Sequence, residues 1–227
     1  MKRSYPAGLV LGLFLLAAPG ARAQALPPHP GSLPLSEPQH LAELDFQHCR
    51  FELLSLGVAF ERLDPTAHDD PQCGIARPVR VTMPAPGVRL TPPGIMQCET
   101  ARALARWVSL FVLPASGLLP ERGPIAALTQ SSTHVCRPVN NLTGGDLSEH
   151  AYGNAIDIRE FRFAAGPPVA VEPRERQGTP AEAFQDAVRA AACLTFTTVI
   201  GPGTDAAHAD HLHLDVKRRR GGFRLCQ

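Results

Sequence analysis

Residues 148–158 read SEHAYGNAIDI, a stretch that joins a glycine-flanked loop carrying His150 to an alternating pattern typical of a strand. Successive side chains on a strand point to opposite faces, so Ile156 and Ile158 are predicted to face the core. Asp157 is then displayed on the other face. A loop histidine and a strand carboxylate seven residues apart are thereby expected to converge on one ion.

A second stretch, residues 208–216, reads HADHLHLDV. On a strand, His211, His213 and Asp215 share one face, and the leucines between them face the core. A lone His-x-His pair is more often a surface coincidence or a core pair, and the chain has nine histidines. Combined with the first stretch, the pair indicates a metal. Two imidazoles and one carboxylate suit Zn²⁺ and leave a fourth position open for a water whose pKa is lowered.

The rest of the pattern indicates a mixed fold. Apolar spacing predicts a helix at 42–58, ended by Gly57, and another at 99–112, ended by Pro114. The capping-box sequence at 179–182 predicts a third helix reaching about residue 192. Strands are predicted at 79–83, 88–90, 127–137, 154–163, 169–172, 195–200 and 211–216. We expect an α+β domain: a small antiparallel sheet with helices packed on one side and a zinc cleft on the open face.

The N-terminus has the three parts of a secretory signal. A positive start is followed by an apolar run at 7–18 and by the small-residue pattern Ala21-Arg22-Ala23. The alternative is a membrane anchor, but the run is shorter than the roughly 20 residues that a spanning helix needs. We therefore predict a signal peptide at 1–23, a flexible Pro-rich tail at 24–40 and one domain at 41–227. The mature protein is expected to lack a membrane span and to be periplasmic or secreted.

Cysteine content and charge narrow the class further. Six cysteines in an exported chain favour up to three disulfides, and we expect a local bridge between Cys49 and Cys73. The absence of a Cys-x-x-Cys pair argues against a structural zinc finger. A formal net charge of +1 gives no global field toward nucleic acid, so no nucleic-acid partner is expected. The basic run 217–220 is interpreted as a solvated surface feature, with contact to an anionic wall or membrane polymer as the alternative.

The two histidine stretches carry a family resemblance. The pattern Ser148-x-His150-x-x-Gly153-x-Ala155-x-Asp157, followed by a distal His-x-His, resembles the D-alanyl-D-alanine metallopeptidase group. That group includes wall carboxypeptidases, D-Ala-D-Ala dipeptidases, murein endopeptidases and the hedgehog signalling domain. With Cys136-Arg137, Gly201-Pro202-Gly203 and Cys226 added, the order of motifs is similar to the bacterial extensin-like C-terminal family over about residues 45–227.

The resemblance implies a role for each matching residue. The zinc ligands would be His150, Asp157 and His213. His211 would sit beside the metal and polarise the substrate or stabilise charge. Asp210 stands where the peptidase group often has a glutamate base; it is one methylene shorter and can serve only from a loop before the strand. Arg137 would hold a substrate carboxylate, the alternative being an ordinary surface arginine.

These observations lead to one expected function and two rivals. The expected protein is an exported zinc-dependent hydrolase of peptide bonds in peptidoglycan, of the DD-endopeptidase or carboxypeptidase type, with a peptidoglycan peptide as substrate. The first rival is a catalytically silent zinc-containing domain that binds the cell wall or has a structural role. The second is a wall-binding scaffold held by disulfides without a metal.

Overall fold

The computed structural model describes residues 37–227. The predicted signal peptide (1–23) and most of the predicted tail (24–40) lie outside the described residues. The described part of the chain begins with helix α1 (Glu37–Ser55). Pro38 suits a first helical turn, because the N–H that proline lacks has no intrahelical acceptor there. No helix among the described residues is long and apolar enough to cross a membrane.

The larger sheet has seven strands in the order β10-β8-β9-β6-β5-β3, and β7 also pairs with β6. Its strands are β3 (Arg89–Thr91), β5 (Ile125–Ser132), β6 (Ala155–Phe163), β7 (Val169–Ala170), β8 (Thr198–Ile200), β9 (Leu212–Asp215) and β10 (Leu225–Cys226). The pairs β3–β5 and β8–β10 are parallel, and the others are antiparallel. The sheet is therefore mixed and larger than the small antiparallel sheet predicted. Two short edge strands, one missed by the sequence patterns, account for the parallel pairs.

Along one of its edges, the long strand β6 pairs with two different strands. Its first half pairs with β9, in the register Ile158↔Leu212, and its second half pairs with β7, in the register Glu160↔Ala170. On its other edge β6 pairs with β5, with a register shift where Thr129 faces Glu160 and Gln130 faces Ile158. Arg159 is therefore a bulge residue at the junction of β9 and β7.

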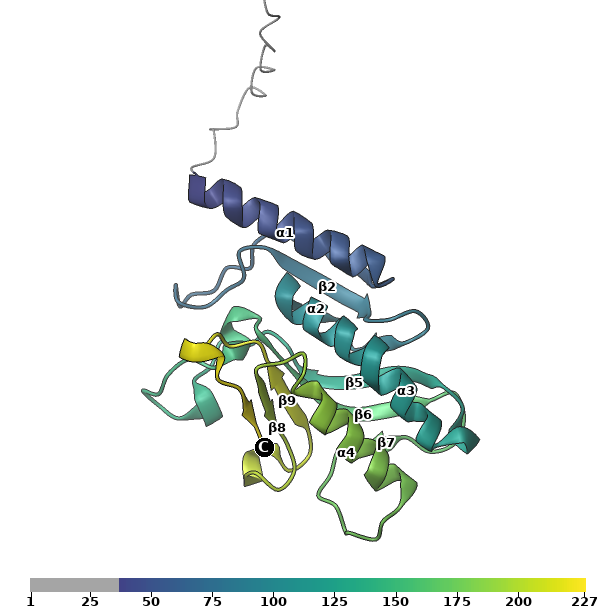
Figure 1. The fold of residues 1–227 in the computed structure, drawn as a ribbon. Helices are drawn as coiled ribbons and strands as arrows, with labels where there is room; N and C mark the ends of the chain where they lie inside the picture. The colour runs from purple at the N-terminus through teal and green to yellow at the C-terminus, as the bar shows by residue number, and fades with distance from the viewer. Residues whose placement is uncertain (1–36) are drawn as a thin grey trace, which may run out of the picture.

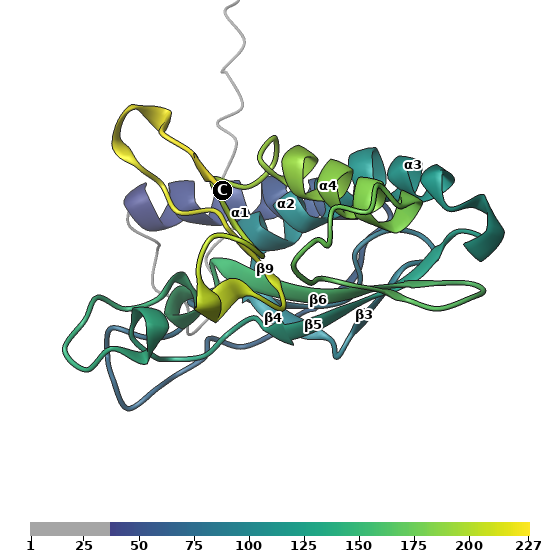
Figure 2. The ribbon, with the colours of Figure 1, turned by 90° about the horizontal axis from the view of Figure 1, so that it is seen from below.

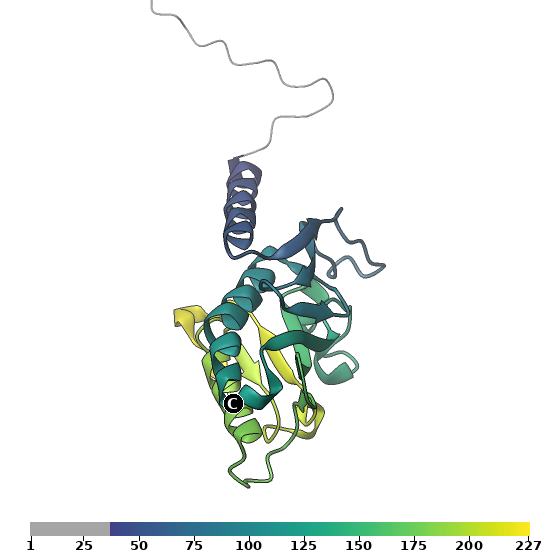
Figure 3. The same cartoon turned by 90° about the vertical axis from the view of Figure 1, so that its right-hand side faces the viewer.

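A second sheet of three antiparallel strands packs beside the first, in the order β1-β2-β4. Its strands are β1 (Ala59–Arg62), β2 (Pro78–Met83) and β4 (Gly94–Gln97). Helix α1 lies along β2 and α2 (Cys98–Trp107) at one end of the molecule (Figures 1 and 3). This unit provides the strand that leads directly into α2.

The helices gather on one side of the larger sheet, as predicted (Figure 2). They are α1, α2, α3 (Leu113–Ala115) and α4 (Pro180–Ala192). At α4 the predicted capping box forms, with Thr179 and Glu182 each bonded to the other's backbone N–H. Pro114 does not stop the second helix where predicted. A π-helical turn at Val108–Val112 precedes it, and this wider turn relieves the clash that a proline ring makes with the carbonyl four residues earlier.

The core lies between the helices and the inner face of the sheet. Trp107 of α2 donates its indole N–H to the carbonyl of Val188 in α4 at 2.8 Å and meets Phe161 and Phe196 edge-on. Burial of each such apolar side chain contributes about 1.5–3 kcal/mol. The residues of β6 and β9 that face this core are fully buried, as the alternation predicted: Ile156, Ile158, Leu212 and Leu214. The residues between them on each strand therefore face the opposite side.

Three disulfides join all six cysteines: Cys49–Cys98, Cys73–Cys136 and Cys193–Cys226. The predicted Cys49–Cys73 bridge is wrong. Cys49 is buried on the face of α1 that packs against α2, and α2 begins at Cys98, so helix packing joins residues 49 apart in sequence. Cys73 lies in the loop before β2 and is linked to the loop after β5. Three disulfides are typical of an extracytoplasmic protein.

Candidate metal centre

Strand pairing brings two of the predicted ligands face to face. Asp157 of β6 lies directly opposite His213 of β9 in the antiparallel register. Both residues alternate with core residues, so both project from the sheet face that the helices do not cover. His211 precedes β9, and Asp215 ends it on the same side of the strand as His213. The sequence alternation predicted this display correctly.

A short 3₁₀ turn, Glu149–Tyr152, carries His150 to the same place. Ser148 caps the turn, and its hydroxyl accepts a hydrogen bond from the backbone N–H of His150. Gly153 ends the turn with φ +68°, a conformation that glycine adopts without strain. A Cβ at Gly153 would lie 2.2 Å from Cδ1 of Ile75, so a larger residue there would displace the turn. His150 itself is fully buried.

The three residues form a compact cluster of ligand atoms. Nε2 of His150 lies 3.2 Å from Oδ1 of Asp157 and 3.2 Å from Nδ1 of His213, and the last two atoms are 3.0 Å apart. Zinc bound tetrahedrally at about 2.0–2.1 Å from N and O atoms places its ligands roughly 3.3 Å from one another. The triangle is therefore the size that one such ion requires, and the residues present fit it.

The outer nitrogens of both histidines have partners that fix the tautomers. Nδ1 of His150 lies 3.0 Å from the carbonyl oxygen of Thr133, and Nε2 of His213 lies 3.2 Å from Oδ2 of Asp215. A nitrogen that faces a carbonyl or carboxylate donates its proton, which leaves the other ring nitrogen as a lone pair aimed inward. In its neutral form, each histidine thus presents a lone pair to the centre of the triangle.

Asp215 is an outer residue of the site to which the sequence analysis gave no role. It is buried, and its Oδ1 accepts the backbone N–H of Lys217 at 3.0 Å. Its place two residues after His213 on one strand face was the signal that could have revealed it. The carbonyl of Thr133 left no signal, because any residue type supplies a carbonyl.

The electrostatics of the cluster favour a cation at its centre. Burial alone would raise the pKa of Asp157, but hydrogen bonds with His150 and His213 outweigh it and hold that pKa well below its usual range. Burial alone would lower the pKa of His213, but hydrogen bonds with Asp157 and Asp215 outweigh it and raise that pKa to about 9. The two carboxylates thus stabilise one positive charge, which a proton or a metal ion supplies in competition.

Two further histidines line the rim of the cluster. Nε2 of His211 lies 3.8 Å from Oδ1 of Asp157, so His211 borders the triangle without belonging to it. The ring of His208 lies 5.2 Å from that of His211 and 5.8 Å from that of His213, centroid to centroid. Asp205 holds His208 through Nδ1 at 2.7 Å. The sequence patterns gave no predicted role to His208, although its spacing before His211 and His213 is visible in the sequence.

Asp210 occupies a turn before β9, as its expected role required, but both of its oxygens are already engaged. Oδ1 lies 2.9 Å from Nδ1 of His211, and Oδ2 lies 2.6 Å from Nη2 of Arg159. Its side chain is 61% exposed. The carboxylate therefore orients His211 and does not contact the triad.

Arg137 does not join the cluster. Its guanidinium donates to the carbonyl of Pro138 at 3.4 Å, and no hydrogen bond or ion pair connects it to the triad among the described residues. Its backbone has a structural part, because the carbonyl of Arg137 accepts the N–H of Ser148, the residue that caps the His150 turn.

The basic run 217–220 is largely held by the protein itself. Lys217 pairs with Glu149 at 3.1 Å, Arg218 pairs with Glu99 at 3.1 Å, and Arg219 donates to the hydroxyl of Thr198 at 2.7 Å. Glu149 is the neighbour of His150, and Thr198 is a hydrogen-bond partner of Asp215. These contacts therefore hold the C-terminal segment next to the cluster of His150, Asp157 and His213.

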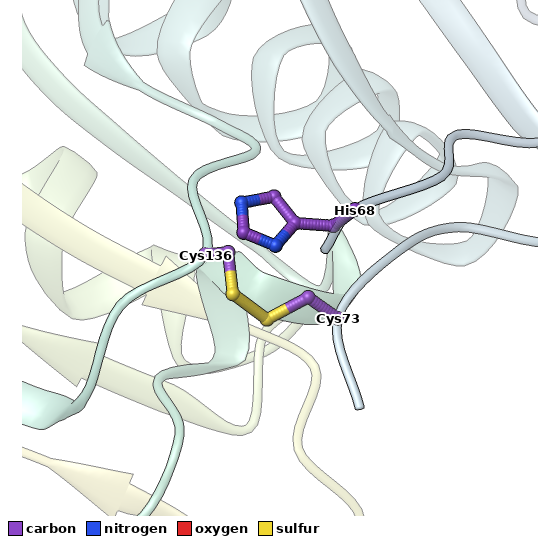
Figure 4. Close-up of side chains that lie close together, drawn as sticks. All are labelled: His68, Cys73 and Cys136. Carbon is purple, nitrogen blue, oxygen red and sulfur yellow. A yellow bond between two sulfur atoms is a disulfide. The ribbon is translucent and has the colours of Figure 1, made fainter. Parts of the chain in front are cut away.

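A second group of side chains of the types that bind metals lies elsewhere: His68, Cys73 and Cys136. Figure 4 shows the imidazole of His68 beside the sulfur atoms, which are bonded to each other. A disulfide sulfur carries no thiolate charge and is a poor ligand. Of these two groups among the described residues, His150, Asp157 and His213 therefore form the one suited to hold a metal ion.

The fold and the site together define a class: a disulfide-linked α+β domain with a buried His/Asp/His cluster that can bind a metal. The family follows from comparison. This chain belongs to the extensin-like protein C-terminus family, whose model matches residues 47–227. No curated protein and no solved structure matches the chain.

Proposed function

We propose that this domain is an exported zinc-dependent hydrolase that cuts peptide bonds in peptidoglycan, as a DD-endopeptidase or a carboxypeptidase. The observation that carries the proposal is the triangle of His150, Asp157 and His213, with ligand atoms 3.0–3.2 Å apart and a further histidine at its edge. The similarity of the linked motifs to the D-alanyl-D-alanine metallopeptidase group supplies the substrate class. The three disulfides support export.

Zinc in a site of two histidines and one carboxylate polarises a carbonyl oxygen and lowers the pKa of a water toward neutrality. The protein's own contribution begins with orientation. Thr133 and Asp215 hold the two ligand histidines in the tautomers that binding requires, so little reorganisation is needed.

His211 is the residue best placed to act on a substrate. Asp210 holds its Nδ1, so Nε2 is the atom that faces the triad. From there an imidazole accepts a proton, or as imidazolium donates a hydrogen bond to a developing oxyanion. Asp210 is accordingly proposed as the residue that positions His211 and not as the base itself. His208 with Asp205 forms a second carboxylate–imidazole pair on the same rim.

Arg137 remains a candidate for holding the substrate carboxylate. Its half-buried guanidinium makes only a long contact with the carbonyl of Pro138 among the described residues, so its other donors are available to a ligand. The role requires the loop after β5 to bring Arg137 toward the triad when substrate binds.

The alternative is a domain that binds zinc without catalysis and serves in wall binding or structure. One observation favours it: the carboxylate at the position of the expected base is bonded to Arg159 and His211, away from the triad. A buried, well-oriented cluster suits a structural metal as well as a catalytic one. The two functions therefore differ in what His211 does.

The test combines metal analysis with product analysis. Wild-type protein purified with zinc and incubated with crosslinked muropeptides should give new products by mass spectrometry, and His150→Ala should give neither zinc nor products. His211→Ala should keep its zinc and lose activity by about 10²–10⁴-fold, the usual contribution of a positioned acid or base. Asp186→Asn, an exposed change on α4, is the matched control and should behave as wild type.

Each outcome separates the candidates. Zinc retained by the wild type with no product from varied crosslinked substrates would favour the silent domain. No bound zinc after zinc-replete purification would contradict both the hydrolase and the silent zinc domain. It would leave the wall-binding scaffold that is held by disulfides without a metal. Products from His211→Ala at the wild-type rate would remove His211 from the chemistry.

A further inference from the structure

A cavity of about 370 Å³ opens beside the metal-type cluster. Thr129, Arg159, Glu160, Arg162, Ala170, Val171, Glu172 and Asp210 line it. It lies where β6 passes from β9 to β7, at the bulge formed by Arg159. The bulge is fixed on its other side, since the carbonyl of Arg159 accepts the N–H of Val171 at 2.8 Å. A volume of this size holds a small ligand group.

The cavity is joined to the candidate reaction centre through one residue. Asp210 lines the cavity with one oxygen bonded to Arg159 and bonds His211 with the other. His211 in turn borders Asp157. Glu160 follows Asp157 by three positions along β6, a span of roughly 10 Å. An extended peptide covers that span in about three residues.

The charges on the cavity wall are of both signs. Arg159 and Arg162 face three carboxylates, those of Glu160, Glu172 and Asp210. Nε of Arg162 lies 2.6 Å from Oε1 of Glu160, in an ion pair, and donates a hydrogen bond to the hydroxyl of Thr129 at 3.3 Å. Its two terminal amino groups have no partner among the described residues. They remain available to a ligand carboxylate, which guanidinium groups bind in paired fashion.

Glu172 supplies the complementary group. Its carboxylate makes no hydrogen bond or ion pair with any described residue, while its backbone carbonyl is held by Gln185 at 2.7 Å. The backbone is therefore fixed and the exposed carboxylate is free to receive a cation. A wall with free guanidinium donors and one free carboxylate matches a group that carries both an acid and an amine.

We propose that this cavity is a substrate subsite for a residue whose side chain ends in both an ammonium and a carboxylate group. The inference rests on the proposed peptidoglycan substrate, whose stem peptides have such a residue when diaminopimelic acid occupies the third position. Arg162, with Arg159, would bind the carboxylate, and Glu172 would bind the ammonium. The subsite would then select the peptide to be presented to the centre.

Binding of short peptides tests the subsite without requiring cleavage. Three tripeptides are compared by calorimetry on zinc-loaded wild type, ending in diaminopimelic acid (amine and acid), lysine (amine only) or 2-aminopimelic acid (acid only). The first should bind about tenfold more tightly than either of the others, the usual effect of one charge-assisted hydrogen bond. Arg162→Gln should abolish the advantage over lysine, and Glu172→Gln the advantage over 2-aminopimelic acid.

The control is Arg80→Gln, which removes an exposed strand arginine paired with Glu61 in the other sheet and should keep the ranking. Equal affinity for the three peptides, no binding of any, or an unchanged ranking in both cavity variants would overturn the subsite. The ranking found together with uncut crosslinked peptides would uphold the subsite and reject the hydrolytic function. Cleavage that is indifferent to the third residue and to Arg162→Gln would reject the subsite alone.

Discussion

Among the described residues, two groups of three potential metal-binding side chains lie close together, and they differ in how the protein holds them. His150, Asp157 and His213 meet at 3.0–3.2 Å, and His150 and Asp157 are buried while His213 is partly buried. The group of His68, Cys73 and Cys136 lies on two loops, with an exposed histidine and sulfurs that are bonded to each other. Only the first group has outer residues that orient its donors.

The difference shows that a metal site is defined by what holds the ligands as well as by the ligands. Strand register aligns Asp157 with His213, a capped turn fixes His150, and buried acceptors set both tautomers. His68 has one local contact, the backbone N–H of Asp70 at 3.1 Å. The first arrangement lowers the cost of binding an ion, and the second does not.

The largest effect should come from removing a ligand of the first group. His150→Ala leaves two ligands and removes one of the two histidine partners of Asp157, so zinc content should fall from roughly one ion per chain to a trace. His68→Ala is the matched change in the second group and should keep the wild-type content. Elemental analysis after dialysis measures both, and equal zinc in the two variants would contradict the assignment.

The next effect concerns the disulfides. Replacing Cys73 and Cys136 by serine should cost roughly 2–5 kcal/mol of stability, and replacing Cys193 and Cys226 should cost a similar amount. Only the first pair should also weaken zinc binding, by about tenfold, because Cys136 closely follows Thr133, whose carbonyl orients His150. Thermal unfolding and zinc titration measure the two quantities. A matching loss of zinc affinity in the second pair would show a general loosening instead.

A smaller effect is expected from the partner of His213. Asp215→Asn keeps the shape of the side chain but removes the charge that holds Nε2, so zinc affinity should fall about 10–100-fold. Competition with a fluorescent chelator measures this. Asp186→Asn removes an exposed carboxylate paired with Arg174 and should leave the affinity unchanged. An unaltered affinity in Asp215→Asn would mean that the tautomer of His213 is set without this contact.

Much of the site could be predicted from sequence because strand alternation is a local rule. This rule predicted that Asp157 and His213 point to one face of the sheet and that the isoleucines and leucines next to them in the two strands are buried. The partners of Asp210 could not be predicted in this way, since Arg159 approaches it through a bulge at a strand junction. A bulge depends on how two strands share an edge, and no periodicity records that.

The fold was predictable at the level of elements and less so in their assembly. The capping box located α4, and helical spacing located α1 and α2. The disulfide partner of Cys49 depended on α1 packing against α2, a long-range contact, and the parallel pairs depended on short edge strands. Such contacts are selected by the whole core and leave weak local signals.

The smallest effect is expected on stability when His68, of the second group, is replaced. His68→Ala removes an exposed imidazole whose described contact is one turn hydrogen bond, so the free energy of unfolding should change by less than about 0.5 kcal/mol. Denaturant unfolding under oxidising conditions measures it, with and without added zinc. If His68 instead helped to bind an ion beside the disulfide, added zinc would stabilise the wild type more than the variant. We expect an equal gain in both, because the proposed binding site of the ion is the group of His150, Asp157 and His213.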